Sequence, residues 1–409
     1  MRKATGLFVL FAAFALALAV VPVWAQTDAT TAATPAATMA APAAPMITVG
    51  GLVDGYYTYN FTNSSKGMNG HGNYGYNYGG VDLNSMDDTF SLSVAEMVVQ
   101  MKQGDVSGVV ALWMQGQSGL SGMNLLVANA TYNAGQFSFM GGRFGDWMGN
   151  EAFDTNANWN YSHSLLYNFT LPLWLQGVNV TYTPSDSIMV KAYATEGWVA
   201  DPGNFVDYGK TYGLQIGLKP DSNWGVKLNG ILGPNGGWFS DLEPGDSLYV
   251  GEAIISYKAS DDFSLALDGE YGGIDPVNGE VAPSANPLLI PPIPLKTESF
   301  WGAALYGKYQ IATDWNVALR LEELESNDNW LYKGGIPTVG GSPYVEIREA
   351  TLTLSDQVTK NLLFRVEGRY DMGYTGGTMD DPSGTPAMGP YAGGSGGQLT
   401  GTGSAVFSF

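Results

Sequence analysis

Apolar and polar side chains alternate with a period of two along most of the chain after residue 46. In "NLLFRVEGRYDM", residues 361–372, apolar residues alternate with the charged residues Arg365, Glu367, Arg369 and Asp371. Successive residues of a strand point to opposite faces, so such a strand has one apolar face and one charged face. A buried soluble core would not accept this charged row, whereas the polar interior of a membrane barrel would. The pattern predicts strands that separate lipid from water.

Sixteen segments of this kind follow one another. They are residues 47–61, 89–101, 106–115, 123–133, 135–144, 172–183, 187–198, 209–219, 223–233, 247–258, 262–272, 299–311, 314–325, 344–355, 361–373 and 397–409. An even number of strands allows both ends of a closed antiparallel barrel to emerge on the same side. We therefore predict an all-β fold, a transmembrane antiparallel β-barrel of about 16 strands.

The connections between these segments alternate in length. Short turns such as "KQGD" and "TPSDS" are rich in Asp, Ser, Gly and Pro, as tight turns are. The longer connections are residues 62–88, 116–122, 145–171, 199–208, 234–246, 273–298, 326–343 and 374–396. Short turns on one side and long loops on the other are typical of outer-membrane barrels.

Aromatic residues gather at the ends of the predicted strands, on their apolar face. Beside the short turns stand Tyr132, Phe137, Tyr182, Trp224, Tyr257, Phe263, Tyr309, Trp315 and Phe409. At the opposite ends stand Tyr57, Tyr59, Trp198, Tyr212, Tyr249, Tyr271, Trp301 and Tyr370. Amphipathic rings prefer the two membrane interfaces, so the two groups predict the aromatic girdles of a barrel.

The N-terminal part divides the chain into three regions. Residues 1–25 carry Arg2, Lys3, an apolar run and "VWA" before Gln26, which predicts a secretory signal peptide. Residues 26–46 are an Ala/Thr/Pro-rich stretch with the composition of a flexible linker. The barrel is expected to cover residues 47–409.

Composition argues against several classes of function. Acidic residues outnumber basic ones, 38 to 18, and no basic stripe is visible, so nucleic acid is not an expected partner. The chain has no cysteine and two histidines, His71 and His163, which disfavours thiol catalysis and nitrogen or sulfur metal centres. Ser162 and His163 are adjacent, and neighbouring side chains point apart, so they do not predict a catalytic pair. We expect no enzyme activity, no metal and no cofactor.

Several stretches carry a resemblance to a known family. They are "NWNYSHSLLYNFTLPLWLQGVNVTYTPSDSIMVKAYATEGW" with "GGRFGDWMGNE" before it, "VDGYYTYNF", "FSLSVAEM" and "EATLTLSDQVTKNLLFRVEGRYD". Together they resemble the putative β-barrel porin-2, OmpL-like family of bacterial outer-membrane proteins. The resemblance implies an outer-membrane porin over residues 47–409 and supplies no substrate or binding residues.

Parity assigns a set of charged residues to the interior. The predicted pore-lining residues are Asp54, Glu96, Lys191, Lys227, Asp268, Glu270, Arg320, Glu322, Arg365, Glu367, Arg369 and Asp371. They would set ion selectivity, or pair with each other and stiffen the wall.

The loop at residues 145–171 is long enough to suggest a functional role. We hypothesise that it folds into the pore and presents Asp146, Glu151 and Asp154 to four arginines of the wall, in which case it would constrict the channel. These arginines are Arg143, Arg320, Arg365 and Arg369. A loop that caps the barrel or packs on a neighbouring subunit remains the alternative.

The C-terminal strand places Phe407 and Phe409 on its apolar face. A C-terminal aromatic strand resembles the signal by which outer-membrane barrels are handed to the barrel-assembly machinery, so both residues are predicted to act in assembly. The last strand is expected to pair with the first, which removes both sheet edges.

The predicted function is a porin: a passive aqueous channel for small hydrophilic solutes or ions in the outer membrane of a Gram-negative bacterium, with periplasmic termini. Expected partners are outer-membrane lipid, lipopolysaccharide, the assembly machinery and the solutes, with a possible homotrimer. Two alternatives stay open. One is a barrel plugged by its loops, with a structural or surface-binding role, and the other is a soluble secreted all-β binding protein.

Overall fold

The computed structural model describes residues 44–61, 86–115, 123–197, 209–234, 247–275, 298–327, 344–375 and 397–409. The chain divides into two compact units, Met1–Pro42 and Ala43–Phe409, and every described residue belongs to the second. The predicted signal peptide, most of the linker, and Trp198 and His71 lie outside the described residues.

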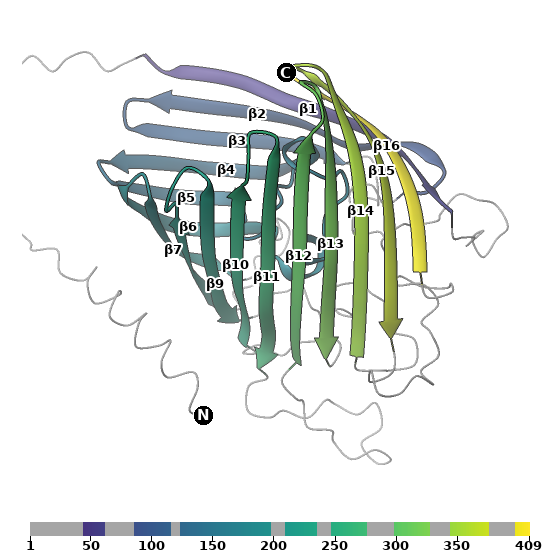
Figure 1. Cartoon of the computed structure of the whole chain (residues 1–409). Helices are drawn as coiled ribbons and strands as arrows, with labels where there is room; N and C mark the ends of the chain where they lie inside the picture. The colour runs from purple at the N-terminus through teal and green to yellow at the C-terminus, as the bar shows by residue number, and fades with distance from the viewer. Residues whose placement is uncertain are drawn as a thin grey trace, which may run out of the picture. The chain divides into compact units, whose positions relative to one another are not determined.

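Sixteen strands make up this unit (Figure 1). They are β1 (Met46–Asn60), β2 (Thr89–Gln103), β3 (Val106–Gln115), β4 (Met123–Ala134), β5 (Phe137–Gly145), β6 (Trp174–Ser185), β7 (Ile188–Glu196), β8 (Lys210–Leu218), β9 (Trp224–Pro234), β10 (Ser247–Lys258), β11 (Phe263–Asp275), β12 (Glu298–Gln310), β13 (Trp315–Asn327), β14 (Tyr344–Thr359), β15 (Leu362–Thr375) and β16 (Gly397–Ser408).

The strands form one closed antiparallel barrel in which each pairs with its neighbours in the sequence. The barrel closes where β1 pairs with β16, from Leu52 opposite Ser408 to Asn60 opposite Thr400. Gly51 and Phe409 also exchange backbone hydrogen bonds, with N···O distances of 3.1 and 3.0 Å. The predicted fold class and the pairing of first and last strands are confirmed.

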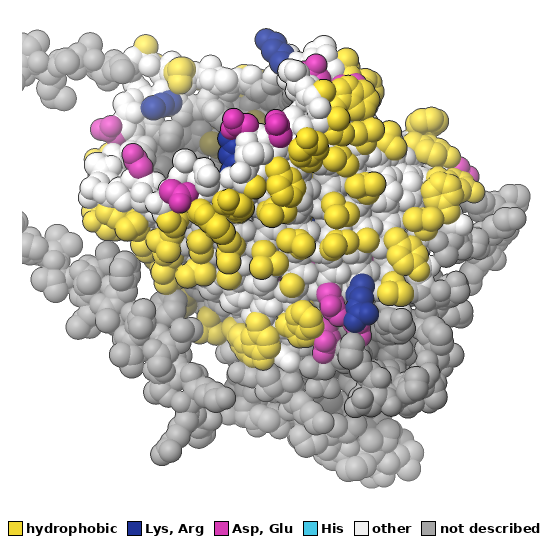
Figure 2. All heavy atoms as spheres, in the orientation of Figure 1, with side chains coloured by type: hydrophobic (Ala, Val, Ile, Leu, Met, Phe, Trp, Pro, Cys, Tyr) yellow, Lys and Arg dark blue, Asp and Glu magenta, His cyan; other side chains and the backbone are white. Residues whose placement is uncertain are grey.

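The period-two pattern now has a direction. On β15 the even residues Phe364 and Val366 are exposed on the outside, whereas the odd residues Arg365 and Glu367 are buried on the inside. Figure 2 shows the result on one face of the barrel: apolar side chains cover the outer surface of the strands as a band, with charged groups near its two margins. Such a band matches the hydrocarbon layer of a bilayer.

The aromatic rings beside the short turns form neighbouring pairs on the outer surface. Phe137 stacks on Tyr182 of the adjacent strand at 4.7 Å between ring centroids. Trp224 and Tyr257, also adjacent, lie 4.3 Å apart. The short-turn end therefore carries one of the two expected aromatic girdles.

One connection departs from the barrel wall. Between β5 and β6, residues 146–173 contain a short 3₁₀ helix, η2 (Thr155–Ala157), and an α-helix, α2 (Leu165–Thr170). Ser164 caps α2, because its side chain accepts a hydrogen bond from the Tyr167 N–H. No helix among the described residues is long and apolar enough to cross a bilayer.

Candidate functional site

Residues 146–173, here called the inserted segment, lie inside the barrel. The Asp146 N–H donates to the Leu173 carbonyl at 3.2 Å, which joins the two ends of the segment where it leaves the wall. Tyr161 is 1% exposed and Leu165 is fully buried. The segment is therefore enclosed by the strands, and its polar backbone must find its hydrogen bonds there.

Apolar packing holds one side of the segment. Leu165, Leu166, Tyr167, Phe169 and Leu171 belong to a buried cluster that continues onto nine strands. The wall residues of this cluster are Phe144, Leu175, Tyr193, Ile231, Leu248, Val250, Ala266, Phe300, Ala304, Tyr306, Leu324 and Ile347. Gly302 on β12 permits the close approach, because a side chain there would collide with Leu166. On the other side, Phe153 packs edge-on against Trp113 of β3 at 5.2 Å.

Arg320 of β13 is the most connected wall residue and has no exposed surface. Its guanidinium donates to the carboxylates of Glu349 and Glu151 at 2.8 and 2.7 Å. It also donates to the carbonyls of Ser162 and His163 at 2.6 and 3.1 Å, and to the Ser162 hydroxyl at 3.3 Å. One side chain thus fastens the segment to the wall through both charge and backbone.

Carboxylates of the same wall receive backbone N–H groups of the segment. Glu322 accepts from Leu165 and Leu166, each at 2.7 Å. Glu367 accepts from Tyr161 at 2.6 Å and from Ser162 at 3.0 Å. Since hydrogen bonds to a charged acceptor are about twice as strong as neutral ones, these two residues anchor the segment at two points.

Two further arginines bind backbone carbonyls of the segment. Arg365 donates to Thr155 and Asn158 at 2.7 and 3.1 Å. Arg369 donates to His163 at 2.7 Å and pairs with Asp371 on its own strand at 2.8 Å. The face made by β13, β14 and β15 therefore carries three buried guanidinium groups with carboxylates beside them.

The neighbouring wall, formed by β1 and β2, is bound through uncharged donors and a pair of carboxyl groups. Asp54 of β1 accepts from the Thr155 hydroxyl at 2.8 Å and from the Tyr161 hydroxyl at 3.2 Å. Beside them, the carboxyl groups of Asp154 and Glu96 act on each other. The segment therefore meets β1 through hydroxyl groups and β2 through a carboxyl group.

A third contact region lies on β10 and β11. The Gly149 N–H donates to Glu252 at 2.6 Å, and the Asn150 N–H donates to Asp268 at 3.1 Å. The hydroxyl of Thr170 donates to Glu270. Three carboxylates on adjacent strands thus hold the segment from this side.

Interior lysines lie towards the short-turn end. Lys191 and Lys308 are partly exposed and place their ammonium groups over the rings of Trp147 and Trp159, at 4.9 and 5.5 Å from the ring centroids. Lys227 is exposed, and it lies on the same face of β9 as the buried interior residue Asn229, two residues later. These lysines are interior charges that water reaches, unlike the buried arginines.

The structure brings most of the predicted pore-lining residues to the inserted segment. Asp54, Glu96, Lys191, Asp268, Glu270, Arg320, Glu322, Arg365, Glu367 and Arg369 each interact with it. Asp371 interacts with Arg369, and Lys227 lies apart from the segment's hydrogen bonds. Their role in selectivity stays a prediction.

The hypothesised charge pairs of the segment form only in one case, between Glu151 and Arg320. Asp146 instead accepts from the Met148 N–H at 3.0 Å, and Asp154 meets Glu96. Arg143 donates to the Leu126 carbonyl at 3.0 Å. The physical reason is that the arginines bind backbone carbonyls instead of carboxylates. For Arg320, Arg365 and Arg369 these carbonyls belong to the turns of the segment. A sequence shows where charges lie along the chain, but it does not show where backbone carbonyls point.

Burial changes the ionisation of two segment residues. It raises the pKa of Asp146 to about 8, against the lowering effect of the Met148 N–H. It also raises the pKa of Asp154. With this pKa Asp146 is mostly neutral at neutral pH, so it does not supply the full negative charge that the sequence suggests.

Glu252 and Glu349 are interior residues that the sequence reasoning missed. On β10, Glu252 lies on the same inner face as the apolar residues Leu248, Val250 and Ile254. That face is largely apolar because the inserted segment packs on it, so the interior and lipid faces of β10 look alike in the sequence. A charged residue within an otherwise apolar row was the available signal.

His163 and Ser162 are structural in this arrangement. The His163 ring stacks on Tyr167 at 4.2 Å, and its Nε2 lies 3.0 Å from the Ala152 carbonyl. The Ser162 hydroxyl accepts from Arg320. Both are buried within the segment.

A closed barrel with an apolar outer band and a charged interior that holds a folded-in loop defines a protein of the outer-membrane porin class. The sequence matches the family described as putative beta-barrel porin-2, OmpL-like, over residues 46–409, and the chain belongs to that family. It is therefore an outer-membrane porin, and family and fold indicate a channel rather than an enzyme.

Solved structures share the fold. OmpT of Vibrio cholerae, in its trimer form, aligns with a TM-score of 0.59 at 12% identity, over 90% of this chain and 100% of that one. The channel DcaP of Acinetobacter baumannii aligns with a TM-score of 0.59 at 13% identity, over 89% and 97%. An anion-selective porin from Comamonas acidovorans aligns with a TM-score of 0.56 at 12% identity, over 90% and 100%. A search of curated protein sequences gives no match.

Proposed function

We propose that this porin is a passive aqueous channel for small hydrophilic solutes or ions, and that the inserted segment forms its constriction. The observation that carries the proposal is the fixed position of the segment inside the barrel. Arg320, Glu322 and Glu367 hold it by charged hydrogen bonds of 2.6 to 3.1 Å. A constriction needs such rigidity, because solute selection depends on a stable bore.

The interior charges support an attraction for anions on the short-turn side. The acids beside the inserted segment are buried and already hydrogen-bonded, whereas Lys191, Lys227 and Lys308 are at least partly exposed. Accessible lysines lower the energy of an anionic group passing them. The neighbour from Comamonas acidovorans is called anion-selective, but at 12% identity it shares the fold alone.

Planar-bilayer recording tests the proposal. We expect stepwise conductance, and a reversal potential in a salt gradient that moves towards cation preference in Lys191→Met/Lys227→Met. Replacing residues 149–164 by a short Gly/Ser linker should increase the conductance. Lys258→Met is the control, because the charge of this exposed lysine is already paired with Asp261 in a turn at 2.7 Å. Unchanged conductance and selectivity in both interior variants would contradict the proposed constriction.

A barrel plugged by its own loop is a second candidate. The inserted segment bonds to β1 on one side and to β10, β11, β13, β14 and β15 on the others, so it reaches walls all round the barrel. Liposome swelling separates the two functions. A constricted channel admits small sugars, whereas a plugged barrel admits none until the segment is removed.

We further propose that both termini are periplasmic and that the protein assembles as a homotrimer. The start of β1, where Met46 pairs with Lys102 beside the β2–β3 turn, and the last strand, where Ser408 bonds to Asn361 in the β14–β15 turn, both lie at the short-turn end. This end faces the periplasm in outer-membrane barrels. The trimer form of the OmpT neighbour suggests the assembly, as do many barrels of this size. Lipid, lipopolysaccharide and the assembly machinery are the proposed partners. Light scattering of the detergent complex would measure the oligomer.

A further inference from the structure

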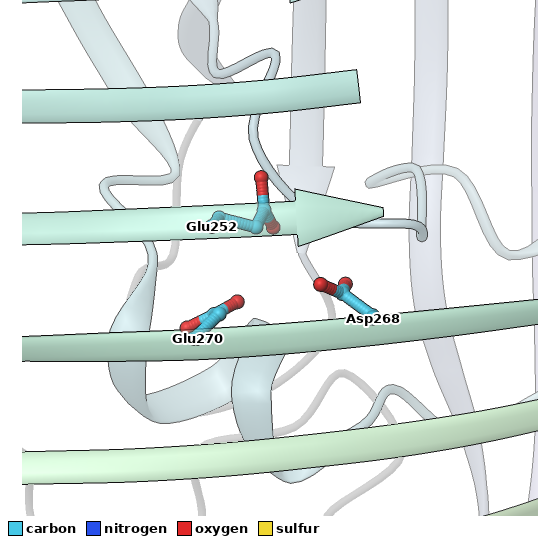
Figure 3. A group of neighbouring side chains, drawn as sticks. All are labelled: Glu252, Asp268 and Glu270. Carbon is cyan, nitrogen blue, oxygen red and sulfur yellow. The ribbon is translucent and has the colours of Figure 1, made fainter. Parts of the chain in front are cut away.

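Glu252, Asp268 and Glu270 form a compact carboxylate group on the inner face of β10 and β11, here called the carboxylate triad. Glu252 and Glu270 are direct partners in the strand pairing. Asp268 precedes Glu270 by two residues on β11 and lies on the same face. One oxygen from each residue lies within 4.8 Å of the other two. Figure 3 shows the three side chains turned towards a common space between the strands.

The triad has little positive charge near it. Among the described residues, no lysine or arginine forms an ion pair with any of its three members, although Lys227 of β9 acts on Glu252 at longer range. By contrast, Glu349 of β14 and Asp371 of β15 pair directly with arginines. Asp268 is 1% exposed, and Glu252 and Glu270 are each 5% exposed. Three buried carboxylates this close require compensation, by protons or by a cation.

The N–H and hydroxyl donors around the triad reach four of its six carboxylate oxygens. Glu252 uses both oxygens, with Gly149 and Asn229. Asp268 and Glu270 each use one oxygen, with Asn150 and Thr170. In the described part of the chain, Asp268 Oδ1 and Glu270 Oε1 are buried and receive no N–H or hydroxyl group, and Glu270 lies against the carboxyl group of Glu252. Buried oxygens without a donor are costly, and a cation is a partner that satisfies both at once.

We propose that the carboxylate triad binds one divalent cation, with Ca²⁺ fitting best. Two oxygens on one Ca²⁺, at 2.3–2.6 Å each, can lie up to about 5 Å apart, whereas on Mg²⁺ they can lie at most about 4.2 Å apart. The three ligand oxygens lie within 4.8 Å of one another, which is inside the span that Ca²⁺ can bridge. Water and nearby oxygens such as that of Thr170 complete the six to eight ligands that Ca²⁺ takes.

The site would join the wall to the inserted segment. The same three carboxylates accept hydrogen bonds from Gly149, Asn150 and Thr170, which lie at both ends of the segment. A bound cation would hold the carboxylates in place as acceptors, so Ca²⁺ would stabilise the seated segment. This role does not depend on whether the barrel conducts.

Calcium titration of the refolded, lipopolysaccharide-free protein in detergent tests the site. After removal of metal with EDTA, isothermal titration with CaCl₂ should show one site per chain, with a Kd on the order of 10⁻⁴ to 10⁻³ M, as for extracellular calcium modules. Asp268→Asn and Glu270→Gln should each weaken binding at least about tenfold. Glu367→Gln is the matched control: this buried carboxylate also accepts two segment N–H groups, but it lies on β15, away from the triad. It should keep the calcium affinity.

Denaturant midpoints separate metal binding from a purely structural role. Without metal, Asp268→Asn should be at least as stable as the natural protein, because a like charge is removed. With Ca²⁺ the natural protein should become the more stable of the two. The proposal is overturned if the natural protein shows no site at about 10 mM Ca²⁺, if the triad variants bind as tightly as it does, or if Asp268→Asn is less stable in both conditions.

Discussion

Replacing Arg320 by methionine should release the inserted segment. Methionine keeps much of the volume but removes all five hydrogen bonds of the guanidinium, and leaves Glu349 and Glu151 buried without a cation. Breaking a buried ion pair by removing one partner costs about 3–5 kcal/mol. Since each 1.4 kcal/mol is about tenfold, the population with a detached segment should rise by about 10² to 10³.

Two measurements report this release. The urea midpoint of the folded band on unheated gels should fall, and single-channel records should show larger or fluctuating conductance. Adding Glu349→Gln to Arg320→Met should restore part of the stability, because one of the uncompensated carboxylates is then removed. Lys258→Met removes an ion pair that is exposed, and should leave both readouts unchanged. If Arg320→Met matches the natural protein in midpoint and conductance, the reasoning about the segment's anchors is refuted.

Three other changes, two substitutions and one deletion, test separate parts of the structure. Burial raises the pKa of Asp146 from 3.8 to about 8, so its contribution to stability is complete below about pH 4 and is lost as the pH rises to about 8. Asp146→Asn should therefore match the natural protein most closely in urea midpoint at about pH 3 and exceed it by a margin that grows up to about pH 8. Equal midpoints across this range would contradict the reasoning. Gly302→Val should displace α2 by colliding with Leu166 and increase the conductance, whereas Gly269→Val, where a Cβ meets nothing within 4 Å, should not. Phe409 is 57% exposed on the outer surface, and its backbone closes the barrel on Gly51. Its deletion should lower the amount of folded protein in the envelope more than it lowers the conductance of each channel. Normal envelope levels would argue against an assembly role.

The strands could be predicted because lipid and the barrel interior impose opposite polarity on alternate residues. β10 was predicted to within its observed ends, residues 247–258, and the last strand, predicted as 397–409, ends one residue earlier. The end of β14 was placed at residue 355 and lies at Thr359, because the register shifts after Asp356 and the strand continues into the turn. Period-two patterns do not report such irregularities.

The site could be predicted only in part. Parity placed Arg320 and Glu367 inside the barrel, because each alternates with apolar residues that face lipid. The partners of these residues are mostly backbone groups of the inserted segment, and a sequence does not show where a backbone carbonyl points. Glu252 was missed for a related reason: the segment makes part of the interior apolar, so the interior and lipid faces of β10 look alike.

The inserted segment also constrains the order in which the barrel is completed. It precedes most of its partners in the chain, since Tyr161 bonds to Glu367 across 206 residues and Leu166 bonds to Glu322 across 156. Threading a folded loop with a buried apolar cluster into a finished cylinder would expose that cluster to water first. Strands β10 to β15 therefore gain stability by adding around a loop that is already present, which serves them as an internal template. Loop closures this long are slow to form, so weakening the segment should delay the final closure of β16 onto β1 as well as loosen the channel.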